Sequence, residues 1–409
     1  MRVFHFLSND VQSGAGLGTL RLHLALLDLG IDSYLVAYNR DENFNCKNLI
    51  NLNRLKERWK RKINVGINEF SLKRYNKKSD GFFTTGNELF NIFALVNLVA
   101  GDIIHLHWPN YGIPLQRLKK LSEKHNVFWT LRDMWPFTGG CHYSLDCERY
   151  IVGCGHCPIL NSNSKEDISA ASHMKKALMF RNIKFVAISD WMKEEAKKSP
   201  ILTNKCITRI YNSVDDTYFD FSVTQSEARQ SLQIETKKPV LLFGSHNVLD
   251  PYKGADIFKS IYEKYHEDFM FVVFGKNSEK LVGQRKGEFK ALGLLNAERI
   301  KYAYVAADAF LMLSVQEGFG KTIIESFCLG TPVVTLPDGA PEEIGKLYKD
   351  YHEVYSDSLD MKGVIDSLIE KHDKNEMKRI TRDIFSADKI AKEYSELYEF
   401  SAFQSLMKK

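Results

Sequence analysis

The feature that most constrains the fold of this 409-residue chain is an alternation of short apolar runs with helical patterns. In the first half, an apolar run at residues 2–7 precedes a helical pattern at 19–29 and a second run at 33–38. Buried runs separated by helical segments predict parallel strands with helices on both faces of the sheet. The alternation restarts after residue 220, with runs at 239–244, 269–275, 309–313 and 332–336. The sequence therefore predicts two α/β domains, each built on a parallel sheet.

The chain length and one turn-rich segment predict the domain boundaries. A chain of this length fits two domains of roughly 100–200 residues each, and the polar segment 211–216 indicates a linker. We expect Rossmann-like domains at 1–213 and 214–385, with a final helix at 386–409 that packs back on the N-terminal domain. Because parallel sheets bind ligands at the carboxyl ends of their strands, we expect the two domains to face each other across a deep cleft.

The composition excludes several classes of protein. Hydrophobic residues make up 44% and charged residues 26%, which is typical of a globular protein. The net charge of +5 gives no general argument for nucleic-acid binding. The N-terminus lacks the apolar core of a signal peptide, and no later segment reaches about 18 consecutive apolar residues. We therefore expect a cytoplasmic protein.

A turn between the strand at 309–313 and the next helix carries the strongest chemical signal. Its glycines allow backbone N–H groups to approach a ligand closely, and the N-terminus of the helix favours an anion such as a diphosphate. A loop carboxylate can accept hydrogen bonds from sugar hydroxyls, and a helical one can bind a ribose. An ordinary helix N-terminus with acidic residues is the alternative. The candidate ligand contacts are Glu317, Gly318, Phe319, Gly320, Lys321, Thr322 and Glu325.

These residues resemble the EX7E signature of the retaining glycosyltransferase family 4, which has the GT-B fold. Glu317 and Glu325 are the two glutamates of that signature. The Asn-Ser-Val-Asp sequence at 212–215 is similar to the family's Asn-Gly-Val-Asp segment, and Lys253 lies in a turn similar to its Lys-Gly turn. Residues 132–143 further resemble the branch that contains colanic-acid-type exopolysaccharide and O-antigen transferases. The resemblance covers most of the chain.

The resemblance implies a hexosyltransferase that moves a sugar from a UDP- or GDP-sugar to a glycan or lipid-linked acceptor in surface polysaccharide (lipopolysaccharide or O-antigen type) biosynthesis. Glu317 would contact the donor sugar, Glu325 the ribose, and Lys253 the leaving diphosphate, without a catalytic metal. The Arg that commonly precedes the Lys is missing, and Asn247 stands in that stretch. Stabilisation of the diphosphate would then rest more heavily on Lys253 and on the dipoles of the glycine-containing loop.

Two segments of the N-terminal half are further candidates. Gly14 and Gly16 lie in a glycine-rich turn that could face the donor diphosphate or be a tight strand-to-helix connection. Arg132 stands where many relatives have a His near the acceptor, and Arg cannot act as a base. Arg132 could instead hold an acidic group of the acceptor, and Asp133 could hydrogen-bond the acceptor or cap the next turn.

Four cysteines are crowded into a short segment at Cys141, Cys147, Cys154 and Cys157. The knuckle Cys154-Gly155-His156-Cys157 suits a structural zinc, which takes thiolate and imidazole ligands. The alternatives are reduced buried cysteines, which a reducing compartment favours, or a labile disulfide.

A basic amphipathic helix is predicted over residues 54–78, which contain ten Lys or Arg. One face of it carries the apolar residues Leu55, Trp59, Ile63, Ile67 and Phe70. Such a helix can rest peripherally on an anionic membrane, which would suit a lipid-linked acceptor. The alternative is a surface helix that docks its apolar stripe on the core.

Two other functions are compatible with the same fold. A sugar phosphorylase or a nucleotide-sugar epimerase would need phosphate or water as the attacking partner. A catalytically weakened sugar-binding or scaffold subunit would explain the departures at Arg132 and Asn247. Because both glutamates and Lys253 are retained, the sequence favours an active transferase. No nucleic-acid partner is expected, since the charge excess is small and local.

Overall fold

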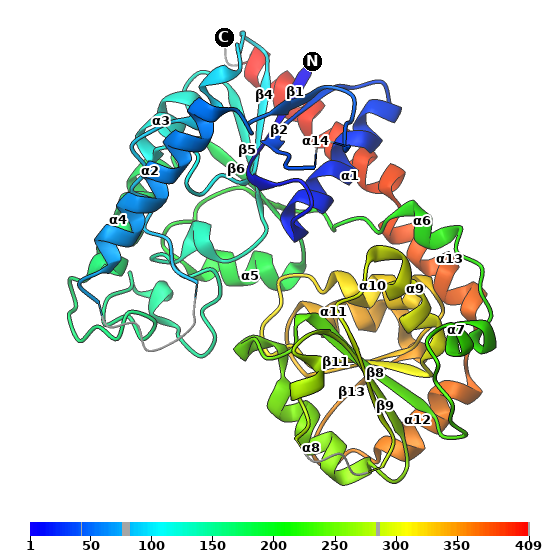
Figure 1. Cartoon of the computed structure of the whole chain (residues 1–409). Coiled ribbons are helices and arrows are strands. Elements are labelled where there is room, and N and C mark those ends of the chain that lie inside the picture. Colours follow the sequence, from blue (N-terminus) through cyan, green and yellow to red (C-terminus); the bar gives the residue numbers. More distant parts are fainter. Residues whose placement is uncertain (42, 76–81, 284–286, 408–409) are drawn as a thin grey trace. The chain divides into compact units, whose positions relative to one another are not determined.

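The computed structural model describes residues 1–41, 43–75, 82–283 and 287–407. The chain folds as two units, Met1–Ser213 with Ala387–Lys409, and Val214–Ser386. Each unit is a parallel sheet with helices on both of its faces (Figure 1), which confirms the predicted α/β class of both domains. In the described ranges, no helix combines the length and apolar composition that crossing a bilayer requires.

The sheet of the N-terminal unit has seven parallel strands in the order β3-β2-β1-β4-β5-β6-β7. Phe4 of β1 pairs with Tyr34 of β2 on one side and with Ile104 of β4 on the other. The strand order therefore changes direction between β1 and β4, where open parallel sheets bind their ligands. The strands are β1 (Arg2–Asp10), β2 (Asp32–Tyr38), β3 (Leu49–Asn51), β4 (Ile103–Trp108), β5 (Asn126–Leu131), β6 (Ile183–Ala187) and β7 (Ile207–Arg209).

The first helix begins earlier than the apolar pattern predicts. Ser13 is its N-cap, and the Ser13 side chain accepts a hydrogen bond from the N–H of Gly16. Gly14 and Gly16 therefore form the first turn of α1 (Gly14–Asp28) and not a loop before it. A Cβ on Gly16 would lie 2.3 Å from the carbonyl oxygen of Asp10, so only glycine fits there.

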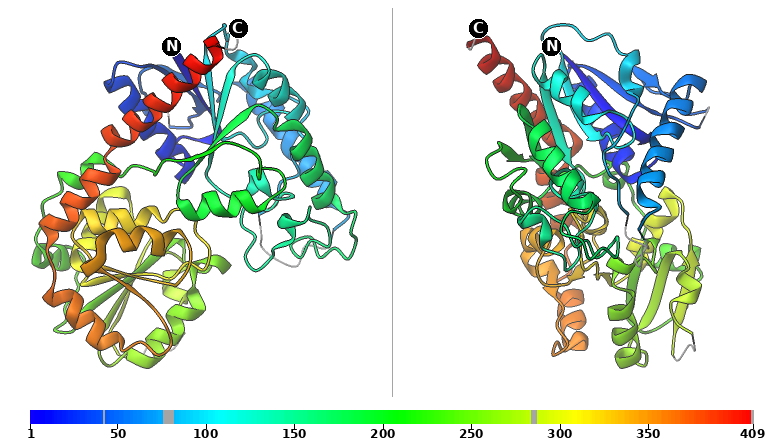
Figure 2. Two further views of the ribbon diagram at one scale, coloured as in Figure 1. Left: turned by 180° about the vertical axis from the view of Figure 1, so that it is seen from behind. Right: turned by 90° about the vertical axis from the view of Figure 1, so that its left-hand side faces the viewer.

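The last helix of the chain belongs to the N-terminal unit. It packs beside α1 (Figure 2), and the hydroxyl of Tyr398 hydrogen-bonds Nδ1 of His105 at 2.6 Å. This last helix is α14 (Ala387–Met407), and the remaining helices of the unit connect its strands. They are α2 (Leu55–Leu72), η1 (Ile92–Leu95), α3 (Leu115–Ser122), η2 (Trp135–Phe137), η3 (Arg149–Ile151), α4 (Ile168–Met179) and α5 (Asp190–Lys198).

Helix α2 buries polar side chains where an apolar stripe was one expectation. Asn64 is buried and donates to the carbonyls of Phe90 and Tyr111 at 2.8 and 2.9 Å. Leu55, Trp59 and Phe70 are 84%, 60% and 76% exposed, so docking of the stripe on the core is wrong at these positions. An asparagine satisfies loop carbonyls that an apolar residue would leave unpaired. The end of the predicted helix at residues 76–78 lies outside the described residues.

The C-terminal unit has a six-stranded parallel sheet in the order β10-β9-β8-β11-β12-β13. Its order changes direction between β8 and β11, and the core on one face includes Phe243, Phe258 and Leu311. The strands are β8 (Val240–Asn247), β9 (Met270–Lys276), β10 (Phe289–Gly293), β11 (Ala309–Met312), β12 (Val333–Thr335) and β13 (His352–Val354). The helices are α6 (Asp216–Phe219), α7 (Gln225–Ser231), η4 (Pro251–Lys253), α8 (Ala255–Tyr265), η5 (Ser278–Lys280), α9 (Ala297–Ala306), α10 (Lys321–Cys328), α11 (Ala340–Gly345), η6 (Lys346–Tyr351), α12 (Met361–Glu370) and α13 (Lys374–Phe385).

Candidate active site

Two loops at the switch point of the C-terminal sheet carry the candidate donor residues. One loop follows β8 and leads to α8, and the other follows β11 and leads to α10. The N–H of Val315 donates to the carbonyl of Tyr252 at 3.0 Å, which ties the two loops together. Residues far apart in the sequence therefore meet at the edge where such sheets bind ligands.

The ion pair between Lys253 and Glu317 is the centre of this site. Nζ of Lys253 lies 2.7 Å from a carboxylate oxygen of Glu317, and the two side chains are 19% and 18% exposed. Burial by itself would lower the pKa of Lys253, but the adjacent Glu317 carboxylate outweighs it and raises that pKa. The lysine is therefore a fixed cation at neutral pH.

Gly254 fixes the turn that presents Lys253. Its φ is +78°, and a Cβ at this position would lie 1.9 Å from the carbonyl oxygen of Leu313. Any side chain would clash with the backbone at the end of the neighbouring strand and would also strain the left-handed conformation. Gly254 is therefore required by the packing of the turn, independently of any ligand.

Glu325 lies inside α10 and is only 4% exposed. Nζ of Lys321 lies 3.3 Å from its carboxylate, one helical turn earlier. Gly320 is the N-cap of this helix, with φ of +81°, and it provides no side chain to cap the first turn. The first-turn N–H groups of α10 are thus free of a side-chain cap, an arrangement that suits an anion.

The other residues named for donor binding have supporting contacts in this unit. Asn247 donates to Asp250 at 2.6 Å and accepts from Asn277 at 2.9 Å, so its amide holds the turn after β8. The hydroxyl of Thr322 lies 3.5 Å from the sulfur of Met312. Phe319 is buried and packs edge-on against the ring of Phe385. Direct contact of Asn247, Phe319 and Thr322 with a donor stays a prediction.

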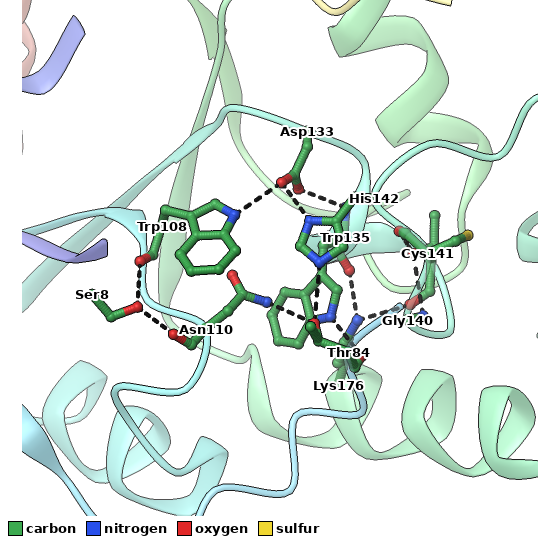
Figure 3. A network of polar contacts seen from close by, with 11 residues as sticks. Ser8, Thr84, Trp108, Asn110, Asp133, Trp135, Gly140, Cys141, His142 and Lys176 are labelled. Atoms are coloured by element: carbon green, nitrogen blue, oxygen red, sulfur yellow. Dashed lines mark hydrogen bonds and ion pairs between the residues drawn. The ribbon is translucent and has the colours of Figure 1, made fainter. Parts of the chain in front are cut away.

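In the N-terminal unit, Asp133 is the centre of a polar network (Figure 3). Its carboxylate accepts hydrogen bonds from Nε1 of Trp108 at 3.2 Å, Nδ1 of His142 at 2.6 Å and the N–H of Trp135 at 2.9 Å. The last of these contacts caps the turn after β5, as one of the two sequence hypotheses for Asp133 expected. The carboxylate thus orients a buried histidine.

His142 is a residue of this network to which sequence reasoning gave no role. Because an ionised Asp133 only accepts, Nδ1 of His142 carries a hydrogen, and Nε2 of the ring lies 3.2 Å from the hydroxyl of Thr84. That hydroxyl in turn accepts from the amide of Asn110 at 3.0 Å. The signal in the sequence was weak, since Thr84 and Asn110 lie far from His142 along the chain.

Lys176 of α4 completes the network and was also missed. It is fully buried, donates to the carbonyls of Trp135 and Thr138 at 2.6 and 3.0 Å, and lies 3.5 Å from the centre of the Trp135 ring. Burial lowers the pKa of Lys176 to about 7, although the neighbouring Cys141, Cys154 and Asp133 raise it. The lysine anchors the segment that carries Asp133 and His142.

Arg132 is partly buried and held by the protein itself. Its guanidinium donates to Asn212 and, at 3.2 Å, to Nδ1 of His107. Since a guanidinium only donates, His107 must carry its hydrogen on Nε2, which then donates to Nδ1 of His5 at 2.9 Å. Burial lowers the pKa of Arg132. Contact of Arg132 with an acceptor stays a prediction.

Three buried histidines lie close together in the N-terminal unit. His5, His105 and His107 are the described residues whose ligand atoms all lie within 4.8 Å of one another. Burial lowers the pKa of each well below the usual value. Their nitrogens are largely occupied by hydrogen bonds, and a cation, Arg132, contacts His107. We assign no metal to them.

The four crowded cysteines line one small cavity of about 20 Å³, together with Phe83 and Tyr150. Cys154 and His156 have left-handed backbone conformations, with φ of +66° and +47°. Burial raises the pKa of Cys141 and of Cys154 to about 12. The cavity has room for a particle of water size. Among the described residues, however, the cysteines do not form a group whose ligand atoms all lie close enough together to hold a metal ion. The structural zinc stays a prediction.

The architecture of both units defines the class of the protein as a GT-B fold. Over 98% of this chain and 99% of the other, it is similar to sucrose-phosphate synthase of Thermosynechococcus elongatus, with a TM-score of 0.63 and 14% identity. HepE of Anabaena, solved in complex with UDP-glucose, is similar over 98% of this chain and 99% of its own, with a TM-score of 0.59 and 14% identity. These likenesses confirm the GT-B prediction.

Sequence comparison identifies the type of domain that the C-terminal unit contains. Residues 224–383 match the family model described as "Glycosyl transferases group 1", so the chain contains a domain of this type. The chain is 26% identical over 197 residues to a putative colanic acid biosynthesis glycosyl transferase, WcaC, of Escherichia coli K12, covering 45% of this chain and 46% of that protein. It is 24% identical over 266 residues to an uncharacterized glycosyltransferase of Methanocaldococcus jannaschii, covering 60% and 67%. The first alignment thus spans less than half of the relative.

Proposed function

We propose that the protein is a retaining glycosyltransferase of family 4 that transfers a hexosyl group from a UDP- or GDP-sugar to a glycan or lipid-linked acceptor in surface polysaccharide synthesis. One observation carries this proposal. Inside the segment that matches the group 1 model, Lys253 and Glu317 lie 2.7 Å apart at the switch point of the sheet. The colanic-acid relative supports the acceptor class, and the HepE complex with UDP-glucose supports the donor class.

The chemistry follows from what each group can do. When the bond between the sugar and the diphosphate breaks, negative charge grows on the diphosphate and needs a fixed cation or oriented N–H groups. Lys253 and the uncapped first turn of α10 supply both. A diphosphate that draws Lys253 to itself frees the carboxylate of Glu317 to accept hydrogen bonds from sugar hydroxyls. The buried Glu325 carboxylate can accept from the two hydroxyls of a ribose.

Nucleotide binding tests the donor class. We expect one of UDP, GDP or ADP to raise the unfolding temperature, while NAD and a short DNA duplex do not. A ligand at 100 times its dissociation constant adds about 2.7 kcal/mol to stability. The variant Glu325→Ala should lose the shift, and Glu370→Ala, at an exposed glutamate of α12, should keep it. Stabilisation by DNA or NAD alone would overturn the transferase proposal.

Transfer from the sugar of the preferred nucleotide then tests catalysis. Lys253→Met should lower kcat by about 10²–10³, since one preorganised charge contact is removed. Lys259→Met removes an exposed lysine of the same unit, whose partner Asp256 is also exposed, and should leave kcat unchanged. Nucleotide binding without transfer, in wild type and variants alike, would instead favour the scaffold subunit. Turnover that requires phosphate would favour a phosphorylase, and interconversion of the nucleotide sugar itself would favour an epimerase.

A peripheral membrane contact is part of the proposal. The exposed Leu55, Trp59 and Phe70 of α2 lie on a helix rich in Lys and Arg, the combination that binds anionic lipid surfaces. Flotation with phosphatidylglycerol vesicles should fall when Trp59→Ser is combined with Phe70→Ser. Equal flotation of this variant and the wild type would argue against the contact.

A further inference from the structure

A basic cavity lies at the carboxyl ends of β1 and β2 in the N-terminal unit. It measures about 450 Å³ and is closed on one side by the first turns of α2. Four of its lining side chains are basic, namely Arg40, Arg58, Arg61 and Lys62, and one is a carboxylate, Asp10. The volume is sufficient for a diphosphate and part of an attached sugar.

Arg61 is built into the wall of this basic cavity. Its Nε donates to the carbonyl of Ser8 at 3.1 Å, and its guanidinium lies over the rings of Tyr38 and Tyr111 at 5.5 and 5.8 Å. In the described part of the chain, its two terminal nitrogens have no hydrogen-bond partner in the protein. An arginine held in this way offers two donors in a fixed plane, the geometry that binds a phosphate through two oxygens.

The other cations of the cavity are also poorly neutralised. Arg40 lies 3.8 Å from Asp10, a loose pair. Arg58 and Lys62, one helical turn apart, form no ion pair with any carboxylate among the residues that the structure describes. Like charges on successive turns of a helix repel one another. Arg58, Arg61 and Lys62 are therefore three clustered positive charges without an ion-pair partner among the residues that the structure describes.

The cavity adjoins the polar network of Asp133 through one residue. The hydroxyl of Ser8 donates toward the carbonyls of Trp108 and Asn110 (Figure 3). The carbonyl of Ser8 accepts from Arg61. The cavity and the network therefore lie at the ends of adjacent strands, β1 and β4, where the strand order changes direction. A ligand bound by its anionic end in the cavity would extend toward Trp108.

We propose that the basic cavity binds the phosphate or diphosphate group of the acceptor, so that the acceptor is a phosphate-linked glycan and not a neutral one. This inference rests on the proposed function, because only a transferase has an acceptor. Three uncompensated cations match the charge of a diphosphate better than the single charge of a uronic acid carboxylate. The cavity offers a site for an acidic group besides Arg132, whose guanidinium already donates to Asn212 and His107.

The test uses the full chain with the preferred nucleoside diphosphate at saturation, so that the phosphate site of the C-terminal unit is filled. Binding of inorganic pyrophosphate is measured by calorimetry for the wild type and for Arg58→Gln/Lys62→Gln. We expect the affinity of the double variant to fall about tenfold or more. The matched control Lys56→Gln/Lys120→Gln removes the same charge at exposed positions outside the cavity and should bind as the wild type does.

Two further ligands identify the source of the anion. Glucuronate should bind more weakly than pyrophosphate, and tighter binding of glucuronate would overturn the assignment to phosphate. Phosphatidylglycerol vesicles should float Arg58→Gln/Lys62→Gln and the control equally. If only vesicle binding were lost while pyrophosphate affinity stayed equal in all variants, the cations would serve the membrane and the proposal would be wrong.

Nucleotide binding in the same samples keeps this test separate from that of the proposed function. Both double variants should keep the nucleotide affinity of the wild type, because every changed residue lies in the N-terminal unit. Normal nucleotide affinity with no pyrophosphate binding would overturn the basic cavity alone. Absence of nucleotide binding by the wild type would overturn the proposed transferase function.

Discussion

At the scale of single residues, both units use carboxylates that are held by a hydrogen-bond donor or a cation. Glu317 is paired with Lys253, and Glu325 lies beside Lys321. Asp133 instead accepts from three donors of the protein, so it has little capacity left for a ligand. A ligand can therefore bind Glu317 or Glu325 in place of the neighbouring lysine, whereas Asp133 supports the fold around it.

The supporting role of Asp133 predicts a stability effect. Asp133→Ala leaves the donors of Trp108, Trp135 and His142 unpaired, and each unpaired buried donor costs about 1–3 kcal/mol. We expect the free energy of unfolding in urea to fall by roughly 3 kcal/mol, and Asp133→Asn to lose less because its amide oxygen can still accept. Asp28→Ala, at an exposed position of α1, should change it by less than about 0.5 kcal/mol.

The opposite result would assign Asp133 a different role. If Asp133→Ala were as stable as Asp28→Ala and yet transferred no sugar, the carboxylate would act on the acceptor and its hydrogen bonds would be secondary. The measurement therefore separates the two hypotheses that the sequence left open.

At the scale of elements, the central strands were predictable because parallel strands buried on both faces are continuous apolar runs, whereas the outer strands β3, β7, β10 and β13 were not predicted. Helix α2 was also predicted, but its buried face was not, because that face carries the polar residues Asn64 and Asn68 instead of an apolar stripe. Their hydrogen bonds go to loops whose position no local pattern reveals. In the site, the contiguous motif around Glu317 and the turn around Lys253 could be found from the sequence, whereas the pairing of Thr84 with His142 depends on the tertiary fold.

The cysteine segment gives a prediction at this scale. If the cavity between Cys141, Cys147, Cys154 and Cys157 holds zinc, protein purified with a reducing agent should contain about one zinc per chain. Cys147→Ser with Cys154→Ser should lose the metal, and Cys206→Ser, at an exposed cysteine elsewhere, should keep it. A metal-free wild type whose mass is two hydrogens below that of the reduced chain would instead show a disulfide.

At the scale of the whole molecule, each unit contains buried histidines that are kept neutral. Burial lowers the pKa of His173 in the N-terminal unit and of His352 in the C-terminal unit to about 4 each. In the unfolded chain each histidine binds a proton near pH 6.5, whereas in the folded chain it stays neutral down to about pH 4. Their contribution to stability is therefore fully present above pH 6.5 and is lost as the pH falls from 6.5 toward 4.

Urea unfolding at a series of pH values between 7.5 and 4.5 measures this loss. At about 1.4 kcal/mol per pKa unit, each of the two histidines should cost roughly 3 kcal/mol by the end of the window. His352→Gln should reduce the proton uptake on unfolding of the C-terminal unit by about one below pH 6, while His246→Gln, at an exposed position, should not. Stability that stayed flat from pH 6.5 to 5 would mean that the folded chain takes up these protons without unfolding, and the buried histidines would then be accessible to water.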